Sequence, residues 1–93
     1  MIKSFADKRT QALYCDGIAK RFPSELAARA VRKLEYVALA TRVEDLRVPP
    51  GNRLHALTGV RNGQHAIAVN DQGRICFRFV DGDAYDVEIC DYH

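Results

Sequence analysis

The chain has 93 residues, of which 47% are hydrophobic and 28% are charged, and its formal net charge is +2. This length and composition suit one soluble domain, expected over residues 1–93, with a single small core. They exclude a membrane-spanning chain, because no apolar run approaches the roughly 20 residues that cross a bilayer. The opening MIKSFADKRTQ lacks an apolar signal segment, so we expect a cytoplasmic protein without a membrane partner.

The kind of basic residue is more informative than the net charge. Ten of the 14 basic residues are arginine, which matches phosphate bidentately where lysine offers only a point charge. A genome whose codons favour arginine explains the same bias equally well. Composition alone therefore leaves nucleic-acid binding open.

The three cysteines form an odd set without a paired spacing: Cys15, Cys76 and Cys90. This argues against a disulfide framework and against a zinc site. Cys76 and Cys90 fall in predicted strands, where a free cysteine is usually a small buried apolar residue. We expect neither a metal nor a cofactor.

The N-terminal region predicts a short strand followed by a helix. Residues 1–5 suit the strand, because apolar and polar side chains alternate there. Asp7 is placed to cap a helix over about 8–15, since its carboxylate can accept orphan backbone N–H groups. Gly17 fits the end of this helix, because glycine tolerates the left-handed conformation.

A longer helix is predicted over about 25–40, with Ser24 as its N-cap. Apolar side chains recur there at helical spacing and form one stripe. The members of this stripe are Leu26, Ala30, Leu34 and Val37. The basic residues on the other sides of this helix indicate either a solvated face or an RNA contact, and a solvated face is the commoner case.

The second half of the chain predicts four strands. A loop over 47–53 contains two prolines and a glycine, which cannot continue a helix or a central strand. Turn residues occur at 58–63 and 70–73, and Asp81-Gly82 is a strong hairpin signal. The strands are expected over 54–57, 65–70, 74–80 and 84–90.

Alternation along these strands predicts the layers of the fold. Ile75, Phe77 and Phe79 lie on one face of the third strand, and Tyr85, Val87 and Ile89 are expected to point inward from the fourth. The other face of the third strand carries Arg74, Cys76 and Arg78. The helix over 25–40 is the only long apolar surface that can cover the apolar face. We therefore predict an α+β fold with an N-terminal strand and two helices on one face of a mainly antiparallel, four- to five-stranded sheet. The opposite face is expected to be exposed, concave and basic.

Known catalytic motifs are absent, including a Walker A loop, GxSxG, HExxH and a paired-cysteine zinc motif. Metal-independent cleavage of RNA remains open, because it needs only proton-transfer groups and cations at the phosphate. His55 should face the open side of its strand, and Arg74 starts a strand after a tight turn. Tyr92 and His93 follow a predicted core strand. Each has a structural alternative: a surface histidine, a sheet-edge arginine or a disordered terminus.

At the level of motifs, the chain resembles the HigB toxins of the RelE/ParE superfamily. The resemblance rests on PPGNRL at 49–54, the GxRxGQ run at 59–64, VNDQ before RICF, the closing DVEI-x-DYH, and the opening MIKSF. It implies a RelE-like fold and a ribosome-dependent messenger-RNA endoribonuclease that acts in the A site by 2′-OH attack. It also implies a helix-turn-helix antitoxin partner, HigA, with operator DNA contacted only through the antitoxin.

The resemblance also implies roles for individual residues. His55, Arg74, Tyr92 and His93 fall on the family's catalytic or RNA-contacting positions. Arg74 would stabilise the phosphate, His55 and His93 would transfer protons, and Tyr92 would position or stack against a base. The predicted RNA-binding residues are Arg53, Arg61 and Arg78.

Three positions depart from the family pattern. Relatives often carry lysine where this chain has Thr58, an acidic residue where it has Val60, and tryptophan where it has Gly73. A lost cation weakens the phosphate site, so a second hypothesis is a weakened or inactive module that binds its antitoxin and acts as a co-repressor. A gyrase poison like the ParE toxins is a third alternative, disfavoured because the motifs match the HigB branch.

Overall fold

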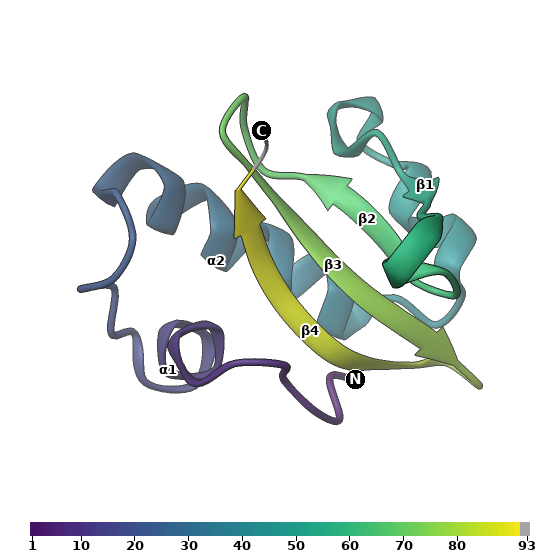
Figure 1. Ribbon diagram of the computed structural model, residues 1–93, viewed down its shortest axis with the longest axis horizontal. Helices are drawn as coiled ribbons and strands as arrows, with labels where there is room; N and C mark the ends of the chain where they lie inside the picture. Colours follow the sequence, from purple (N-terminus) through teal and green to yellow (C-terminus); the bar gives the residue numbers. More distant parts are fainter. Residues whose placement is uncertain (92–93) are drawn as a thin grey trace.

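The computed structural model describes residues 1–91, and Tyr92 and His93 lie outside the described residues. The described part has two α-helices and four strands, connected in places by short 3-10 helices (Figure 1). The α-helices are α1 (Lys8–Asp16) and α2 (Ser24–Leu39), and the 3-10 helices are η1 (Val43–Arg47), η2 (Pro50–Asn52) and η3 (Gly59–Arg61). The strands are β1 (His55–Ala56), β2 (His65–Ala68), β3 (Gly73–Val80) and β4 (Asp83–Asp91).

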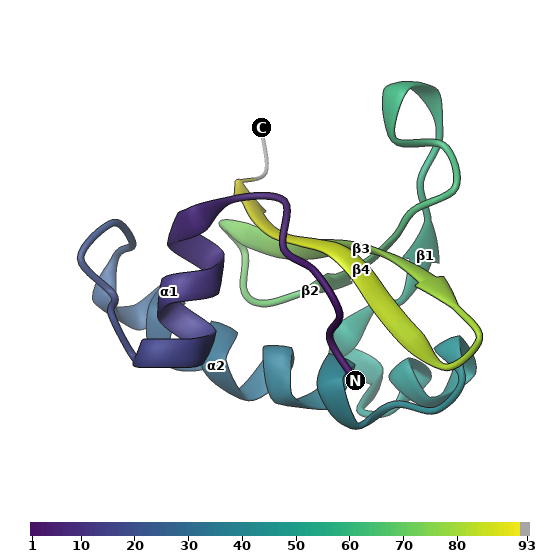
Figure 2. The same cartoon turned by 90° about the horizontal axis from the view of Figure 1, so that it is seen from below.

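The four strands form one antiparallel sheet in the order β1-β2-β3-β4. Both helices lie on the same side of this sheet, which is clear in the edge-on view of Figure 2. The predicted α+β class, with helices on one face of a mainly antiparallel sheet, is therefore confirmed. No helix in the described range 1–91 is both long enough and apolar enough to cross a membrane.

The N-terminal segment runs parallel to β4 but does not form the regular strand predicted for residues 1–5. It makes two isolated bridges, Ile2 with Ala84 and Phe5 with Val87. The backbone N–H of Lys3 donates to the carbonyl of Ala84 at 2.8 Å. The segment therefore lies beside β4 as an irregular fifth element.

Helix α1 begins and ends as predicted. The Asp7 carboxylate accepts a hydrogen bond from the backbone N–H of Thr10 at 2.9 Å. Gly17 ends the helix in the left-handed conformation, with φ of 70°. An N-cap of this kind typically stabilises a helix by about 1 kcal/mol.

Helix α2 keeps its predicted length but not its predicted cap. Pro23 occupies the N-cap position, no side chain caps the helix, and Ser24 is already its first residue. The expected Ser24 cap is therefore wrong. The predicted apolar stripe is confirmed, since Leu26, Ala30, Leu34 and Val37 are all buried.

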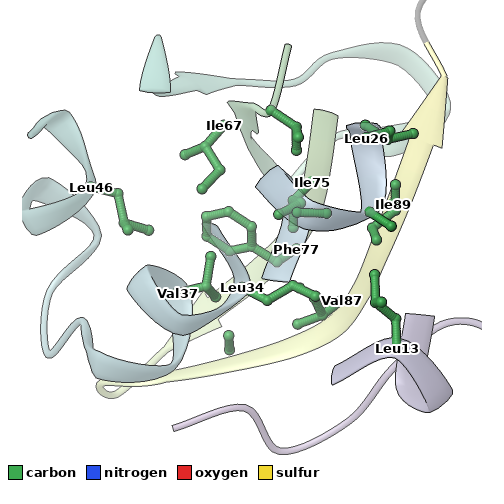
Figure 3. Close-up of a cluster of buried hydrophobic side chains, with 14 of the residues drawn as sticks. Leu13, Leu26, Leu34, Val37, Leu46, Ile67, Ile75, Phe77, Val87 and Ile89 are labelled. Carbon is green, nitrogen blue, oxygen red and sulfur yellow. The ribbon is translucent and has the colours of Figure 1, made fainter. Parts of the chain in front are cut away.

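The main core lies between α2 and the sheet (Figure 3). Phe77 of β3 is fully buried and lies close to Val37 and Leu34 of α2, while Leu13 of α1 closes the core beside β4. Burying one such side chain contributes roughly 1.5–3 kcal/mol. The other large members of this core are Leu26, Leu46, Ile67, Ile75, Val87 and Ile89.

A β-bulge interrupts the pairing of β3 with β4. Cys76 pairs with Glu88, but Arg78 pairs with Tyr85, so two residues of β4 lie opposite Phe77. One of them, Asp86, has φ of 53°. The extra residue reverses the alternation, so Ala84 joins the core and Tyr85 points to the other face. The prediction that Tyr85 points inward is therefore wrong.

Candidate functional site

The sheet surface turned away from α2 carries three of the predicted site residues, His55, Arg74 and Arg78, and we call it the open face. Residues that pair directly across antiparallel strands share a face, so the register defines its members. They are His55 from β1, Ala66 and Ala68 from β2, Arg74, Cys76 and Arg78 from β3, and Tyr85, Glu88 and Cys90 from β4. His65 lies on the opposite face, where its ring stacks on Phe77 with centroids 6.3 Å apart.

His55 and Arg74 are brought to the open face from distant parts of the chain. His55 pairs with Ala66, which pairs with Cys76, and Arg74 lies two residues from Cys76 along β3. Two strand spacings and two residue steps place their Cα atoms roughly 12 Å apart. Both side chains are long enough to approach one nucleotide bound between them.

The backbone holds the His55 ring in one orientation. Its Nδ1 lies 2.9 Å from the carbonyl oxygen of Arg53. A carbonyl only accepts, so Nδ1 carries the proton and a neutral ring keeps its lone pair on Nε2. The ring is exposed, so Nε2 can accept a proton from a bound molecule. Arg53 itself has φ of 48° and an exposed side chain.

The position of Arg74 follows from the turn before it. The side-chain oxygen of Asn70 accepts hydrogen bonds from the backbone N–H groups of Gln72 at 2.8 Å and Gly73 at 2.9 Å. This fixes the start of β3 at the predicted turn. Arg74 then pairs with Ala68 on one side and Cys90 on the other.

Gly73 is tightly packed rather than open. A Cβ added there would lie 2.7 Å from Cδ1 of Leu26, and Leu26 is buried in the core. Leu26 therefore fills the space that a side chain at position 73 would need.

The open face is not the uniformly exposed basic surface that was predicted. Residues 57–64 between β1 and β2 form a segment that we call the covering loop, and it rises from this side of the sheet in Figure 2. Leu57 from this loop packs on Ala66 and Cys76, which are both fully buried. The prediction missed this second small cluster because a single leucine leaves no periodic pattern.

Arg61 anchors the covering loop to β4. Its guanidinium forms an ion pair with Glu88, with Nη2 3.1 Å from Oε1, and donates to Gln64 at 3.1 Å. The same Nη2 lies 3.2 Å from the sulfur of Cys90. Glu88 and Cys90 lie far from Arg61 in sequence, and no spacing signal predicted these contacts.

Arg78 continues the row of arginines across the open face. Its Nε lies 3.4 Å from Oδ2 of Asp86, the residue at the bulge. Its Nη1 lies only 2.9 Å from where a Cβ on Gly63 would be. Gly63 has φ of 92°, so the covering loop favours glycine there for its backbone conformation.

The covering loop also carries two of the departures from the family pattern. Thr58 is exposed at the start of η3, and Val60 is fully exposed within it. The predicted residues Tyr92 and His93 lie outside the described residues. The last described residue, Asp91, pairs with Gly73, so the described part of β4 ends beside the residue before Arg74.

Two thiols lie beside the arginines on the open face. A hydrogen bond from the Cys90 thiol lowers the pKa of Cys76 to about 7, and nearby Arg74 and Arg61 act in the same direction while burial opposes them. The same hydrogen bond raises the pKa of Cys90. Within residues 1–91, no group of three or more His, Cys, Asp or Glu side chains could hold a metal ion.

The chain is similar to known toxins over most of its length. Residues 3–93 match the family model described as RelE-like toxin of type II toxin-antitoxin system HigB. Toxin HigB-1 of Vibrio cholerae is 41% identical over 85 residues, which cover 90% of each chain. Endoribonuclease HigB of Proteus vulgaris is 36% identical over 93 residues, with all of both chains covered.

A solved structure shares the fold at low sequence identity. A chain of the YoeB-YefM complex from Staphylococcus aureus superposes with a TM-score of 0.63 and 11% identity. The match covers 100% of this chain and 98% of the other. At this identity the likeness supports the arrangement of helices and sheet and nothing finer.

Proposed function

Because the chain belongs to the HigB-like family of RelE-like toxins of type II toxin–antitoxin systems, we propose that it is an endoribonuclease that cleaves messenger RNA on the ribosome. The open face is its working surface. The observation that carries this proposal is the placement of His55 and Arg74 on one sheet face, two strands apart. We propose the cytoplasm as its place of action, since translated messages are found there.

The proposed reaction uses the RNA's own 2′-hydroxyl as the nucleophile. The bond from O2′ to phosphorus forms and the bond from phosphorus to O5′ breaks, which leaves a 2′,3′-cyclic phosphate and a free 5′-hydroxyl. One group must take the proton from the 2′-hydroxyl and another must give a proton to O5′. Charge on the phosphate oxygens must be stabilised as the transition state forms.

His55 is suited to take the 2′-hydroxyl proton. The hydrogen bond from Nδ1 to the Arg53 carbonyl leaves Nε2 as the accepting atom, and a fixed ring orientation supports transfer along one direction. Arg74 supplies a delocalised cation that matches phosphate oxygens bidentately. His93 is the proposed donor to O5′, and Tyr92 the proposed base-stacking residue.

Arg53, Arg61 and Arg78 are proposed to bind the RNA backbone outside the reacting phosphate. Arg53 is the most accessible of the three. Arg61 and Arg78 already pair with Glu88 and Asp86, so each would share its charge between a carboxylate and a phosphate. Their contribution per residue is therefore expected to be smaller than that of Arg74.

The proposed partner is a HigA-type helix-turn-helix antitoxin. The YoeB neighbour was solved in a complex with YefM, which supports an antitoxin partner for the fold. Operator DNA is proposed to be reached only through this antitoxin. The ribosome and its bound message are the proposed targets of the free toxin.

Primer extension on a message translated in a cell-free extract tests the activity. The wild-type chain should produce defined stops within codons, and Arg74→Ala should reduce their rate on the order of 10²–10³-fold. Arg47→Ala is the matched control, because Arg47 is an exposed arginine in η1. Cleavage that survives Arg74→Ala undiminished would show that this mechanism is wrong.

A second function is favoured by the neutral side chains of Thr58 and Val60 at the exposed part of the covering loop. A chain without cleavage that still binds its antitoxin would act as a co-repressor module. Absence of stops together with intact antitoxin binding would support this function. Restoration of stops by Thr58→Lys would identify the missing cation as the cause.

A further inference from the structure

Cys76 and Cys90 lie together on the open face, although they are 14 positions apart in the sequence. Cys90 pairs with Arg74 and Cys76 pairs with Glu88, so the two cysteines are diagonal neighbours on adjacent strands. Cys90 packs against the cluster that contains Cys76. The two thiols are close enough that each changes the pKa of the other.

The surroundings of this pair favour a thiolate. Nη2 of Arg61 lies 3.2 Å from the Cys90 sulfur, and Arg74 lies directly across the strand pair. Cationic neighbours lower thiol pKa values and raise the thiolate fraction. The pKa of Cys76 is lowered and that of Cys90 is raised, so the pair holds its charge as a thiolate on Cys76. The two thiols titrate as a unit, so Cys90 becomes nucleophilic when it passes its proton to Cys76.

The two sulfurs differ in access in the way that a redox pair requires. Cys90 is half-buried, so a small oxidant can reach it, whereas Cys76 is fully buried. Cys15 differs from both, because it is an exposed cysteine on α1, away from the open face.

We propose that Cys76 and Cys90 are a redox-active pair that a hydroperoxide oxidises to an internal disulfide between β3 and β4. The Cys90 thiol passes its proton to the Cys76 thiolate as its sulfur attacks one peroxide oxygen. The O–O bond breaks and Cys90 becomes a sulfenic acid; for hydrogen peroxide the leaving hydroxide takes a proton and departs as water. The Cys76 sulfur then attacks the sulfenic sulfur, and the second oxygen leaves as water. Both cysteines are oxidised by one electron each, and the peroxide takes up the two electrons.

The disulfide would change the site next to it, and this part of the inference rests on the proposed function. The bond needs sulfurs about 2.05 Å apart and Cα atoms usually within about 6.8 Å. Diagonal neighbours are about 7–8 Å apart, which is beyond this range, so β4 must move toward Cys76. Cys90 lies opposite Arg74 and directly before Asp91, so this movement displaces the strand end that leads to Tyr92 and His93.

Intact-mass and peptide mapping of the full chain test the disulfide without any activity. After stoichiometric hydrogen peroxide, the wild-type chain should lose the mass of two hydrogens and yield a peptide that links Cys76 to Cys90. Cys15→Ser should behave identically, and Cys76→Ala and Cys90→Ala should not form the link. Oxidation confined to Cys15, or a single oxidised Cys90 without a link, would overturn the proposal.

Primer extension with reduced and oxidised protein tests whether the disulfide slows RNA cleavage. The disulfide form should cleave on the order of 10²-fold more slowly, because small displacements of reacting groups have effects of that size, and dithiothreitol should restore the rate. Equal cleavage rates for the disulfide-linked and the reduced protein would overturn the proposal that the disulfide regulates cleavage. If the reduced protein does not cleave RNA at all, the proposed function is wrong. The mass measurement still shows whether Cys76 and Cys90 form a disulfide.

Discussion

The hydroxyl of Thr10 accepts a hydrogen bond from the backbone N–H of Ile89 at 3.1 Å. Both groups are buried, and Nη2 of Arg9 donates to the carbonyl of the same Ile89 at 3.0 Å. Helix α1 therefore completes the outer edge of β4 beyond the point where the N-terminal segment stops pairing. An edge strand that would otherwise expose its backbone groups is closed by two side chains.

Thr10→Val should lower the free energy of unfolding by about 1–3 kcal/mol. Valine keeps the shape of threonine but leaves the buried Ile89 N–H without its acceptor. Urea denaturation measures the change, and Thr58→Val at an exposed position is the control, expected within about 0.5 kcal/mol of wild type. A Thr10→Val protein as stable as its control would mean that the edge of β4 does not need this bond.

His55→Ala should reduce RNA cleavage on the order of 10²–10⁴-fold, the usual contribution of a positioned acid or base. Added imidazole should restore part of the rate, because it can enter the space left by the ring and accept the same proton. Imidazole should not rescue Arg74→Ala, which lacks a phosphate cation rather than a base. Primer extension in translating extract follows both effects, and equal rescue of the two variants would contradict the assigned roles.

Gly73→Ala should destabilise the protein by about 1–3 kcal/mol through overpacking, since its Cβ would lie 2.7 Å from Cδ1 of Leu26. The double variant with Leu26→Ala should cost less than the sum of the two single changes, because the shortened side chain frees the space. Thermal or urea unfolding of the four proteins gives this coupling. Strict additivity would show that the two positions do not compete for the same volume.

Acidification should weaken the turn that starts η1. Backbone N–H groups of Arg42 and Thr41 donate to the Asp45 carboxylate at 3.1 and 3.0 Å, and these hydrogen bonds lower the pKa of Asp45. A lowered pKa in the folded state stabilises the protein above the unfolded pKa of about 3.9. This stability is lost as the pH falls through the folded value.

Asp45→Asn removes this titration, so the melting temperature of the variant should fall less steeply than that of wild type below about pH 4. Calorimetry across the acid range compares the two curves. Parallel curves for wild type and variant would show that Asp45 does not contribute to the acid sensitivity.

Much of the architecture followed from patterns along the sequence. The stripe from Leu26 to Val37, the Asp7 cap and the Asp81-Gly82 hairpin each depend on neighbouring residues, so local chemistry was enough to place them. In the structure, Asp81 and Gly82 both have positive φ, as the predicted hairpin turn requires. The open orientation of His55 also followed from simple alternation along its strand.

The features of β4, Arg61 and Asn52 that the sequence did not predict depend on contacts with residues far away in the chain or on a single residue without a pattern. The residues from Ala84 to Cys90 show unbroken alternation, but the bulge at Asp86 is set by how β4 matches β3 across the sheet. The contact of Arg61 with Cys90 joins segments 29 residues apart. Asn52 is fully buried and donates to the carbonyls of Leu46 and Val48, and a single polar residue of this kind leaves no periodic signal.

The parallel bridges from the N-terminal segment to β4 have a consequence for the order of synthesis. Residues 1–6 are translated before their backbone partners at 84–87, so they stay unpaired until that stretch has been made. The hydroxyl of Thr10 likewise has no hydrogen bond from Ile89 until that residue has been translated. Domains that close through such distant contacts cannot finish folding early in translation. The open face therefore cannot reach its final form until β4 has been translated.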